Sequence, residues 1–211
     1  MSVCHIFAAG DFCGDFKYTS GDMIIAADAG YAHLIKLNIS PDILIGDFDT
    51  IEEMPEHFEN VIRFPAEKDY TDTQLAIEEG ISRGFRKFII YGALGGKRLE
   101  HTVANLQMSA GYTEKDYEII LTDGMTFVYT VHNSSISFNK NPVGTVSIFS
   151  LTDKSEGVTL SGFKYILSDA TLTNSFALGV SNEFTGSDAE ISVRNGTLII
   201  ITKQRRLNNE N

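Results

Sequence analysis

A succession of short apolar runs in the first 124 residues constrains this chain most strongly. They are rich in Ile, Phe, Ala and Val, as in strands buried on both faces, and occupy residues 3–10, 23–27, 41–45, 60–64, 87–91 and 118–121. Segments with helical character separate several of them, at residues 31–37, 52–59 and 73–84 and up to about residue 111. Strands that alternate with helices in this way predict an α/β fold with a mostly parallel sheet.

The pattern changes near Met125, where the chain becomes rich in Thr, Ser, Val, Phe and Ile. Runs of this composition predict antiparallel strands over residues 126–131, 145–151, 157–160, 190–194 and 197–202. Asn195-Gly196, between the last two runs, predicts a hairpin turn. We therefore expect two domains, an α/β domain over residues 1–126 and an all-β domain over residues 127–211.

The overall charge and the cysteine count exclude several classes of protein. A net charge of −11 argues against a nucleic-acid partner, which needs a basic surface, although it leaves room for a nucleotide. The two cysteines are too few for a disulfide scaffold and fit a reducing cytoplasm. There is no apolar run of about 18 residues, so no membrane partner is expected.

An acidic motif, GDFDT at residues 46–50, follows the third apolar run. If the chain is extended here, Asp47 and Asp49 point to one side and Phe48 to the other. Two like charges so close together call for a cation, and Mg²⁺ held by one or two carboxylates and substrate phosphates would suit them. The same residues are also ordinary turn formers, and the motif alone does not decide between the two interpretations.

Three further strand ends carry charged or glycine-rich segments. Asp28 follows the second apolar run, where α/β sheets bind ligands, although a helix cap would also place an Asp there. KDYTD at residues 68–72 precedes a predicted helix whose N-terminus favours an anion, with a capped surface helix as the alternative. GALGG at residues 92–96 is followed by KRLEH, which combines a flexible turn with two cations.

Carboxylates, a metal ion and phosphate-binding cations are together typical of phosphoryl transfer. The sequence contains neither a Walker-type G-x-x-x-x-G-K-[ST] motif nor the catalytic-loop signature of protein kinases. The chain is therefore expected to belong to neither of these common classes.

Taken in order and with their spacing, these motifs resemble the thiamine pyrophosphokinase (thiamine diphosphokinase) family. The resemblance covers nearly the whole chain and rests on ADAG (27–30), GDFDT (46–50), KDYTD (68–72), residues 92–101 with Asn105, and SNE (181–183). It implies that the N-terminal α/β domain is a catalytic, ATP-binding domain and that the C-terminal domain is a β-sandwich for thiamine binding and dimerisation. It also implies transfer of the pyrophosphoryl group of ATP to the hydroxyl of thiamine, which gives thiamine diphosphate and AMP, by a homodimer.

The resemblance also implies roles for individual residues. The catalytic carboxylates would be Asp28, Asp47, Asp49 and Asp72, and the last three would hold Mg²⁺. ATP would be bound by Lys68, Asp69, Thr71, Thr73, Gly95, Gly96, Arg98, Glu100 and His101. Thiamine would be bound by Ser181 and Asn182 with an aromatic side chain, for which both Phe176 and Phe184 are candidates because the chain has no Trp.

Two features depart from the pattern of the family, which usually has Gly-Gly-Arg-x-Asp-His. The segment from Gly95 to His101 is one residue longer, and Glu100 stands where Asp is usual. Two alternatives to the kinase therefore stay open, a non-catalytic nucleotide or thiamine-phosphate sensor and a metal-dependent phosphohydrolase. The retained acidic residues favour the kinase, since a sensor has no need of a full metal set.

Overall fold

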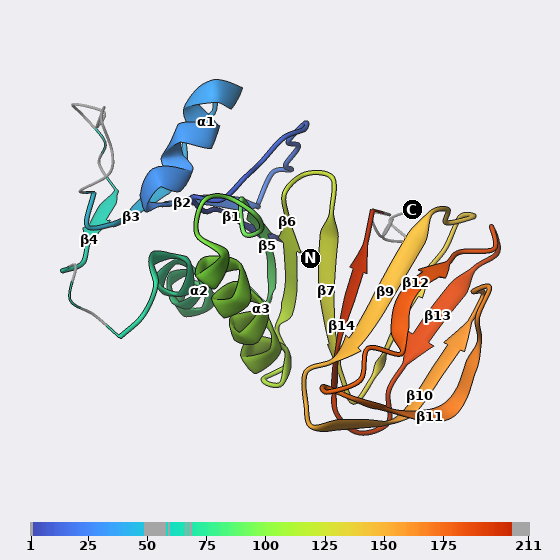
Figure 1. Cartoon of the computed structure of the whole chain (residues 1–211). Helices are drawn as coiled ribbons and strands as arrows, with labels where there is room; N and C mark the ends of the chain where they lie inside the picture. Colours follow the sequence, from blue (N-terminus) through green and yellow to red (C-terminus); the bar gives the residue numbers. More distant parts are fainter. Residues whose placement is uncertain (1, 49–57, 59, 66, 68, 204–211) are drawn as a thin grey trace. The chain divides into compact units, whose positions relative to one another are not determined.

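The computed structural model describes residues 2–48, 58, 60–65, 67 and 69–203 (Figure 1). The chain divides into two compact units. The first comprises Met1–Met108 and Asp116–Met125, and the second comprises Ser109–Lys115 and Thr126–Asn211. Each unit is described by itself.

The first unit is built on a parallel sheet. Its strands, which lie in the order β6-β5-β1-β2-β3-β4, are β1 (Cys4–Phe7), β2 (Met23–Ala27), β3 (Ile43–Gly46), β4 (Val61–Arg63), β5 (Lys87–Tyr91) and β6 (Glu118–Thr122). In the central strands, Ile6 is in register with Ile25 on one side and with Ile90 on the other. All three side chains are buried, as expected for strands covered on both faces.

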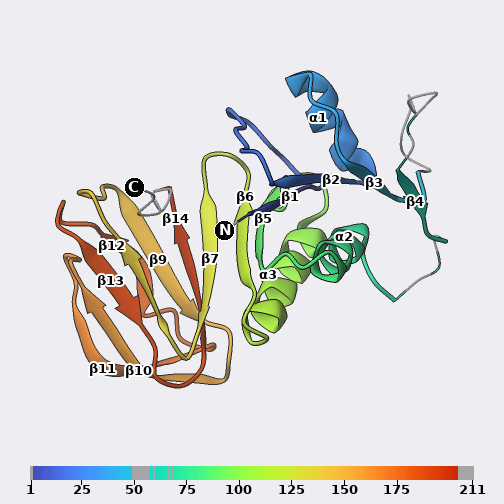
Figure 2. The ribbon, with the colours of Figure 1, turned by 180° about the vertical axis from the view of Figure 1, so that it is seen from behind.

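Helices cover the two faces of this sheet. A short 3-10 helix, η1 (Asp28–Gly30), leads into α1 (Tyr31–Leu37) on one face, and α2 (Asp72–Ser82) and α3 (Leu99–Thr113) begin on the other (Figure 2). The helix α2 comes close to the sheet at Gly80, where an added Cβ would lie 2.6 Å from the Phe88 ring and 3.0 Å from the Cys4 Sγ atom. Burial raises the pKa of the Cys4 thiol to about 12, as expected for a cysteine in the core.

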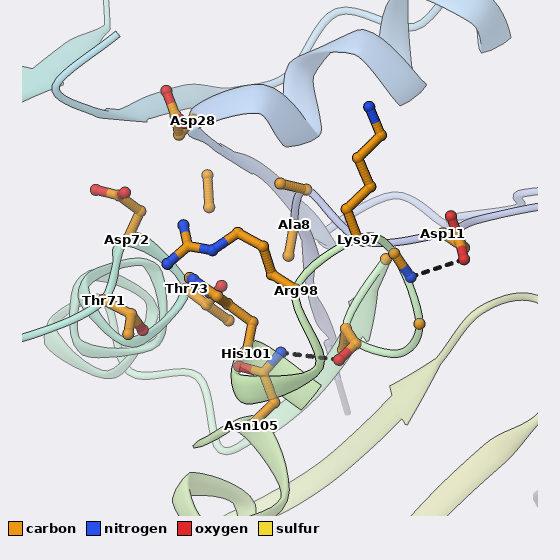
Figure 3. Close-up of a pocket in the computed structure, with 17 residues that line it drawn as sticks. Ala8, Asp11, Asp28, Thr71, Asp72, Thr73, Lys97, Arg98, His101 and Asn105 are labelled. Carbon is orange, nitrogen blue, oxygen red and sulfur yellow. Dashed lines mark hydrogen bonds between the residues drawn. The ribbon is translucent and has the colours of Figure 1, made fainter. Parts of the chain in front are cut away.

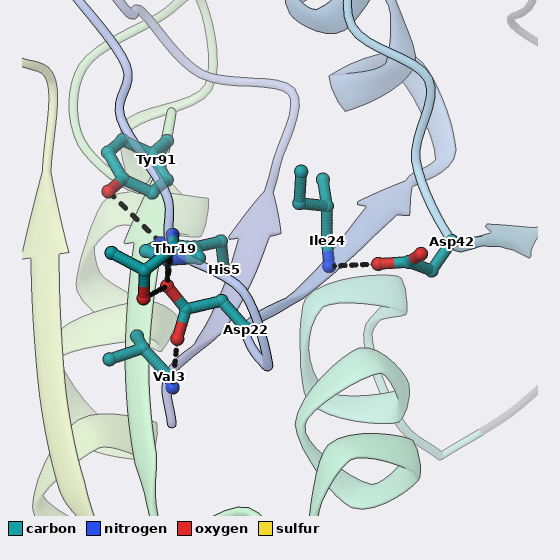
Figure 4. A network of polar contacts seen from close by, with 7 residues as sticks. All are labelled: Val3, His5, Thr19, Asp22, Ile24, Asp42 and Tyr91. Carbon is teal, nitrogen blue, oxygen red and sulfur yellow. Dashed lines mark hydrogen bonds and ion pairs between the residues drawn. The ribbon is translucent and has the colours of Figure 1, made fainter. Parts of the chain in front are cut away.

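At the amino-terminal edge of the sheet, aspartate carboxylates accept hydrogen bonds from the main chain (Figure 4). Asp22 accepts hydrogen bonds from the Val3 N–H at 2.8 Å, the Thr19 N–H at 2.7 Å and the Thr19 hydroxyl at 2.8 Å. Its carboxylate also lies 3.5 Å from the His5 Nε2 atom, and His5 Nδ1 lies 3.2 Å from the Tyr91 hydroxyl. His5 is thus a buried histidine with a hydrogen bond at Nδ1.

The second unit consists of two antiparallel sheets. One has the order β12-β9-β14-β7 and contains β7 (Phe127–His132), β9 (Thr145–Ser150), β12 (Gly179–Glu183) and β14 (Thr197–Thr202). The other has the order β11-β10-β13-β8 and contains β8 (Ser135–Phe138), β10 (Lys154–Ser161), β11 (Leu167–Thr173) and β13 (Ala189–Ser192). Aromatic rings join the sheets, with Tyr129 on β7 5.7 Å from Phe138 on β8. The predicted fold class, α/β followed by an all-β sandwich, is confirmed.

Three expectations about local structure need correction or fall outside the structure. Asn195-Gly196 does not form a hairpin, because β13 and β14 belong to different sheets. The expected turn needs a positive φ at both residues, but only Gly196 has one, 119°. The Gly196 N–H donates a hydrogen bond to the Asn133 Oδ1 atom at 2.8 Å. Three strands that the sequence did not single out are β8, β11 and β12. The helix predicted over residues 52–59 falls almost entirely outside the described residues.

Among the residues that the structure covers, we find no helix with the length and apolarity that crossing a membrane requires.

Candidate functional site

A pocket of about 440 Å³ opens at the carboxyl-terminal edge of the parallel sheet (Figure 3). Its walls come from the segments that follow β1, β2 and β5 and from the first turns of α2 and α3. This is the edge at which open α/β sheets bind ligands. The predicted site residues that line it are Asp28, Thr71, Asp72, Thr73, Gly95, Gly96, Arg98 and His101.

Asp28 reaches this pocket through an uncommon backbone conformation. It follows β2 directly and has φ 46°, a left-handed value that Asp tolerates better than most residues. The end of β3 comes so close that a Cβ on Gly46 would lie 3.1 Å from the Asp28 Cβ. The N-cap of the 3-10 helix is Ala27, one residue earlier. Asp28 therefore lies in the first turn of that helix, where it lines the pocket.

The first turn of α2 brings two hydroxyl groups and a carboxylate to the pocket. Thr71 is the N-cap, and its hydroxyl accepts a hydrogen bond from the Gln74 N–H at 3.2 Å. Asp72 and Thr73 follow in the first turn and line the pocket with it. The first N–H groups of a helix have no partners within the helix, so this turn favours an anion or a metal-bound phosphate.

Two glycine-containing loops lie side by side at the floor of the site. The loop after β1 and the loop after β5 are joined by main-chain hydrogen bonds, Ala8 N–H to Tyr91 O and Gly10 N–H to Gly92 O, both at 2.8 Å. Gly92 has φ 66°, and an added Cβ there would lie 2.3 Å from the Ala8 carbonyl oxygen. No side chain fits at that position, so glycine is required for the two loops to approach each other.

The segment that follows the second loop supplies the cations. The Arg98 guanidinium points to the side of the pocket where Asp72 and Thr73 lie, whereas Lys97 points away from it (Figure 3). Arg98 Nε donates to a Glu100 carboxylate oxygen at 2.9 Å, and that hydrogen bond is the main cause that lowers the pKa of Glu100. Both side chains are about two-thirds exposed. Glu100 does not line the pocket. The contact that the structure shows for its side chain is the one with Arg98.

The buried side-chain amide of Asn105 supports the site. Asn105 on α3 lines the pocket and is only 7% exposed. Its Nδ2 donates to the Ala93 carbonyl oxygen at 2.8 Å. Asn105 therefore ties the helix to the glycine-containing loop after β5.

Several predicted residues do not join this pocket. Asp47 is half-buried and Asp69 is exposed, and neither lines the pocket. Asp49 and Lys68 lie outside the described residues. The expected alternation of Asp47, Phe48 and Asp49 is wrong in its premise, because β3 ends at Gly46 and Phe48 has φ 63° rather than an extended backbone. The Phe48 ring is buried beneath the Arg63 guanidinium, at 5.0 Å.

The donor set limits how a metal could be held. Within the part of the chain that the structure describes, no group of three His, Cys, Asp or Glu side chains is placed to hold a metal by itself. Asp28 and Asp72 nevertheless line one pocket together. Two carboxylates would leave most coordination positions of a metal open, which suits Mg²⁺, because Mg²⁺ commonly takes its remaining ligands from water and phosphate oxygens.

The residues predicted to bind thiamine belong to the second unit. Ser181 on β12 is exposed and has φ 60°, and the register between β12 and β9 shifts next to it. Asn182 is buried, and its amide holds the backbone of Tyr165, accepting from the Tyr165 N–H at 3.0 Å and donating to its carbonyl at 2.7 Å. Phe176 is 68% exposed, whereas Phe184 is packed between Phe138 and Phe163 in the core.

Sequence reasoning missed the loop after β1. Ala8, Ala9, Gly10 and Asp11 all line the pocket. The Gly10-Asp11 pair follows an apolar run, as Gly46-Asp47 does, and this similarity is the signal that could have identified it. Lys97 was recognised as a cation but was not assigned to the site that it helps to line.

Comparison with known proteins extends these observations over both units. The family model described as the catalytic domain of thiamin pyrophosphokinase matches residues 17–121. The family model described as the vitamin B1 binding domain of thiamin pyrophosphokinase matches residues 133–198. The two matched ranges together span most of the chain.

Individual relatives agree with the family models. The thiamine pyrophosphokinase of Bacillus subtilis is 28% identical over 183 residues, which cover 84% of this chain and 85% of the relative. Its crystal structure has a TM-score of 0.83 at 26% identity and covers 95% of this chain and 98% of its own. A thiamin pyrophosphokinase family protein from Enterococcus faecalis has a TM-score of 0.77 at 27% identity, with 97% and 99% covered. Both halves of the sequence and the fold thus agree, and the chain belongs to the thiamin pyrophosphokinase family.

Proposed function

We propose that this protein is a thiamine diphosphokinase, which transfers the pyrophosphoryl group of ATP to the hydroxyl group of thiamine. The bond between the α-phosphate and the β-phosphorus breaks, a bond from the thiamine oxygen to the β-phosphorus forms, the hydroxyl proton is released, and AMP leaves. The observation that carries this proposal is that the chain matches both a catalytic and a vitamin B1 binding domain of thiamin pyrophosphokinase. The pocket in the first unit, with its carboxylates, cations and helix N–H groups, agrees with this match.

The carboxylates are proposed to bind Mg²⁺ together with the phosphates of ATP. Asp28 and Asp72 are the described residues that fit this role, and Asp47 and Asp49 remain proposed ligands that the described pocket does not include. Mg²⁺ bound there would neutralise charge on the phosphate oxygens. The chain itself would contribute the fixed positions of these two carboxylates, one on a left-handed residue and one in a helix first turn.

The remaining pocket residues are proposed to bind the triphosphate. Arg98 faces the side of the pocket that holds Asp72, and the first turn of α2 with Thr71 and Thr73 offers hydroxyl and N–H groups to the same space. Gly95, Gly96 and His101 also line the pocket and would contact the nucleotide, and Lys68 and Asp69 remain proposed contacts. Positioning and charge neutralisation of this kind supply most of the rate in phosphoryl transfer.

Thiamine is proposed to bind near Ser181 and Phe176. The shift in register beside Ser181 and the exposure of the Phe176 ring support this assignment. Since Asn182 already uses its amide to hold Tyr165, we propose that it acts by shaping this surface. Phe184 is the less suitable aromatic candidate because its ring is packed into the core.

Separate detection of the nucleotide products and of inorganic phosphate tests the proposed reaction. Purified protein with ATP, Mg²⁺ and thiamine should give AMP and thiamine diphosphate in equal amounts, and omission of thiamine should abolish AMP formation. Phosphate release without thiamine would identify a hydrolase instead. ATP binding with no product at all would identify a sensor, and ADP as the main product would mean transfer of a single phosphoryl group.

We further propose that two copies form a homodimer that shares its active sites. Exposed apolar side chains in the second unit support pairing, and they include Tyr165, Ile166, Phe176, Leu178 and Val180. Asp72→Asn removes a proposed metal ligand, and Ser181→Arg places a bulky cation where cationic thiamine would bind. If sites are shared between chains, mixing the two inactive variants should restore activity in heterodimers. A fully active monomer by light scattering would contradict the proposal.

The cytoplasm is proposed as the compartment, on the support that Cys4 and Cys13 are both free thiols.

A further inference from the structure

Asp11 contacts the glycine-containing loop after β5 through both its main chain and its side chain. Its N–H donates to the Leu94 carbonyl oxygen at 3.1 Å, and its carboxylate accepts from the Gly96 N–H at 2.7 Å (Figure 3). The two hydrogen bonds fall on either side of Gly95. One residue therefore fixes the loop at two points immediately before Lys97 and Arg98.

The loop has a particular need for such a fixed point. Gly95 and Gly96 have φ angles of 69° and 81°, and two consecutive glycines have more accessible conformations than any other pair of residues. A Cβ on Gly95 would lie 2.6 Å from the Asp11 Oδ2 atom, so the carboxylate lies directly against the loop. The position of Arg98, two residues further on, depends on which conformation these glycines adopt.

Asp11 itself is held firmly by its neighbours. The Gly10 N–H donates to Gly92 O, and His33 Nε2 lies 2.8 Å from the Gly10 carbonyl oxygen; because a carbonyl only accepts, His33 must carry its proton on Nε2. On the other side, Phe12 packs edge-on against Phe7, at 5.6 Å between ring centroids. Contacts on both sides of Asp11 therefore hold the backbone from which its carboxylate projects.

We infer that Asp11 is a positioning residue, which orders the loop Gly95–Arg98 so that Arg98 is placed for the triphosphate before the nucleotide arrives. The inference rests on the proposed function of the same pocket. It assigns to Asp11 no contact with the metal or the phosphates, because its carboxylate is already directed at the Gly96 N–H. A preordered Arg98 reduces the conformational entropy that nucleotide binding must overcome.

Two substitutions at Asp11 separate positioning from direct metal binding. Asp11→Ala removes the hydrogen-bond acceptor, and we expect KM for ATP to rise roughly tenfold, since hydrogen bonds to charged groups are of that strength. KM for thiamine should stay unchanged. Asp11→Asn keeps an acceptor oxygen of the same shape without the charge, and we expect it to restore KM for ATP to within about twofold of the wild type. Asp15→Ala, in the same segment, removes an exposed carboxylate that does not line the pocket and serves as the charge control.

Hydrogen exchange of the nucleotide-free protein gives a readout that does not depend on turnover. The Gly96 amide should be protected in the wild type and in Asp11→Asn and should exchange faster in Asp11→Ala. Equal impairment of Asp11→Asn and Asp11→Ala would overturn the inference in favour of a metal ligand. Unchanged KM and unchanged exchange in Asp11→Ala would overturn it outright. A wild-type protein that forms no AMP would instead overturn the proposed function and would leave the exchange result to stand on its own.

Discussion

The two edges of the parallel sheet use the same residue type in opposite ways. At the amino-terminal edge, Asp22 accepts from the Val3 N–H and Asp42 accepts from the Ile24 N–H at 2.7 Å, so both carboxylates bond to the strands themselves (Figure 4). At the carboxyl-terminal edge, Asp28 and Asp72 line a pocket. All four of these aspartates stand at strand or helix boundaries, and the edge at which they lie separates the two that bond to the strands from the two proposed to act on ligands.

The groups that surround each pair of aspartates account for this difference. At the starting edge the Val3 N–H lies beside Asp22 and the Ile24 N–H lies beside Asp42. A carboxylate only accepts hydrogen bonds, so at the starting edge it binds the backbone. At the other edge Asp28 and Asp72 line a pocket at the place where open α/β sheets bind ligands, and we propose that they act there on cations and metal-bound substrates.

The largest effect among these aspartates is expected at Asp72. Asp72→Asn should lower kcat by about a hundredfold or more, since charge neutralisation at the phosphates contributes several kcal/mol. The urea midpoint should stay the same, because the N-cap of α2 is the Thr71 hydroxyl. A coupled AMP assay and urea unfolding measure the two quantities. A fully active Asp72→Asn would place this carboxylate with the structural pair.

Asp22→Ala should give the reverse result. The change removes the acceptor of three hydrogen bonds in a site where the carboxylate is only 7% exposed. We expect the free energy of unfolding to fall by about 2–3 kcal/mol, because main-chain donors are left without their acceptor. Steady-state kinetics well below the melting temperature should show an unchanged kcat. A loss of kcat without a loss of stability would contradict the division between the edges.

The pH dependence of stability sharpens the same prediction. Burial alone would raise the pKa of Asp22, but the hydrogen bonds from Val3 and Thr19 and the nearby His5 together lower it below its ordinary value of 3.8. A lowered pKa stabilises the folded protein above the ordinary value, and this contribution is lost as the pH falls through the folded-state pKa. Urea unfolding from roughly pH 6 down to pH 3 should therefore show the wild type losing its advantage over Asp22→Ala only at the acid end.

Asp28 should combine both kinds of effect. Its left-handed backbone, with φ 46°, is tolerated by Asn but disfavoured for Ala. Both Asp28→Asn and Asp28→Ala should lose activity, and the Ala variant should be less stable than the Asn variant by roughly 1 kcal/mol. Thermal unfolding of the two proteins side by side measures the difference. Equal stabilities would show that the backbone conformation at this position carries no cost.

The smallest effect is expected at Glu100. Its contact with Arg98 lies at a surface where both side chains are about two-thirds exposed, and such pairs contribute little. Glu100→Gln should raise KM for ATP by no more than about threefold and leave kcat unchanged. A large loss of kcat would instead assign Glu100 to the metal site, as the Asp usual in this position would suggest.

The sequence predicted the strands of the first unit well and the second unit less completely. Continuous apolar runs such as residues 87–91 identified the buried parallel strands, and β5 has those same bounds. The edge strand β12, with its exposed Ser181 and buried Asn182, has no such apolar run. It is a strand because it pairs with β9, which its own sequence does not indicate. Asn195-Gly196 shows the same limit, since a local turn signal does not say which sheet receives the next strand.

The site was predictable to the extent that it follows strand ends. Asp28, Asp72 and Gly95 were found because each follows an apolar run or precedes a helix. Asp11 was not, because its role depends on a hydrogen bond to Gly96, 85 residues further along the chain. The extended chain assumed through Asp47 and Phe48 was wrong because Phe48 has a left-handed φ, which its residue type does not predict.

The two cysteines make this chain convenient for spectroscopy without any engineering. The Cys4 thiol is buried and its pKa of about 12 keeps it protonated at neutral pH, so it should resist maleimides and iodoacetamides. Cys13 is exposed, stands two residues after Asp11, and has its N–H bonded to the Asp123 carbonyl oxygen at 2.8 Å. A fluorophore attached to Cys13 would therefore sit on a backbone that continues directly into the pocket. If ATP binds there as proposed, the emission should change when ATP is added to the protein with its native sequence.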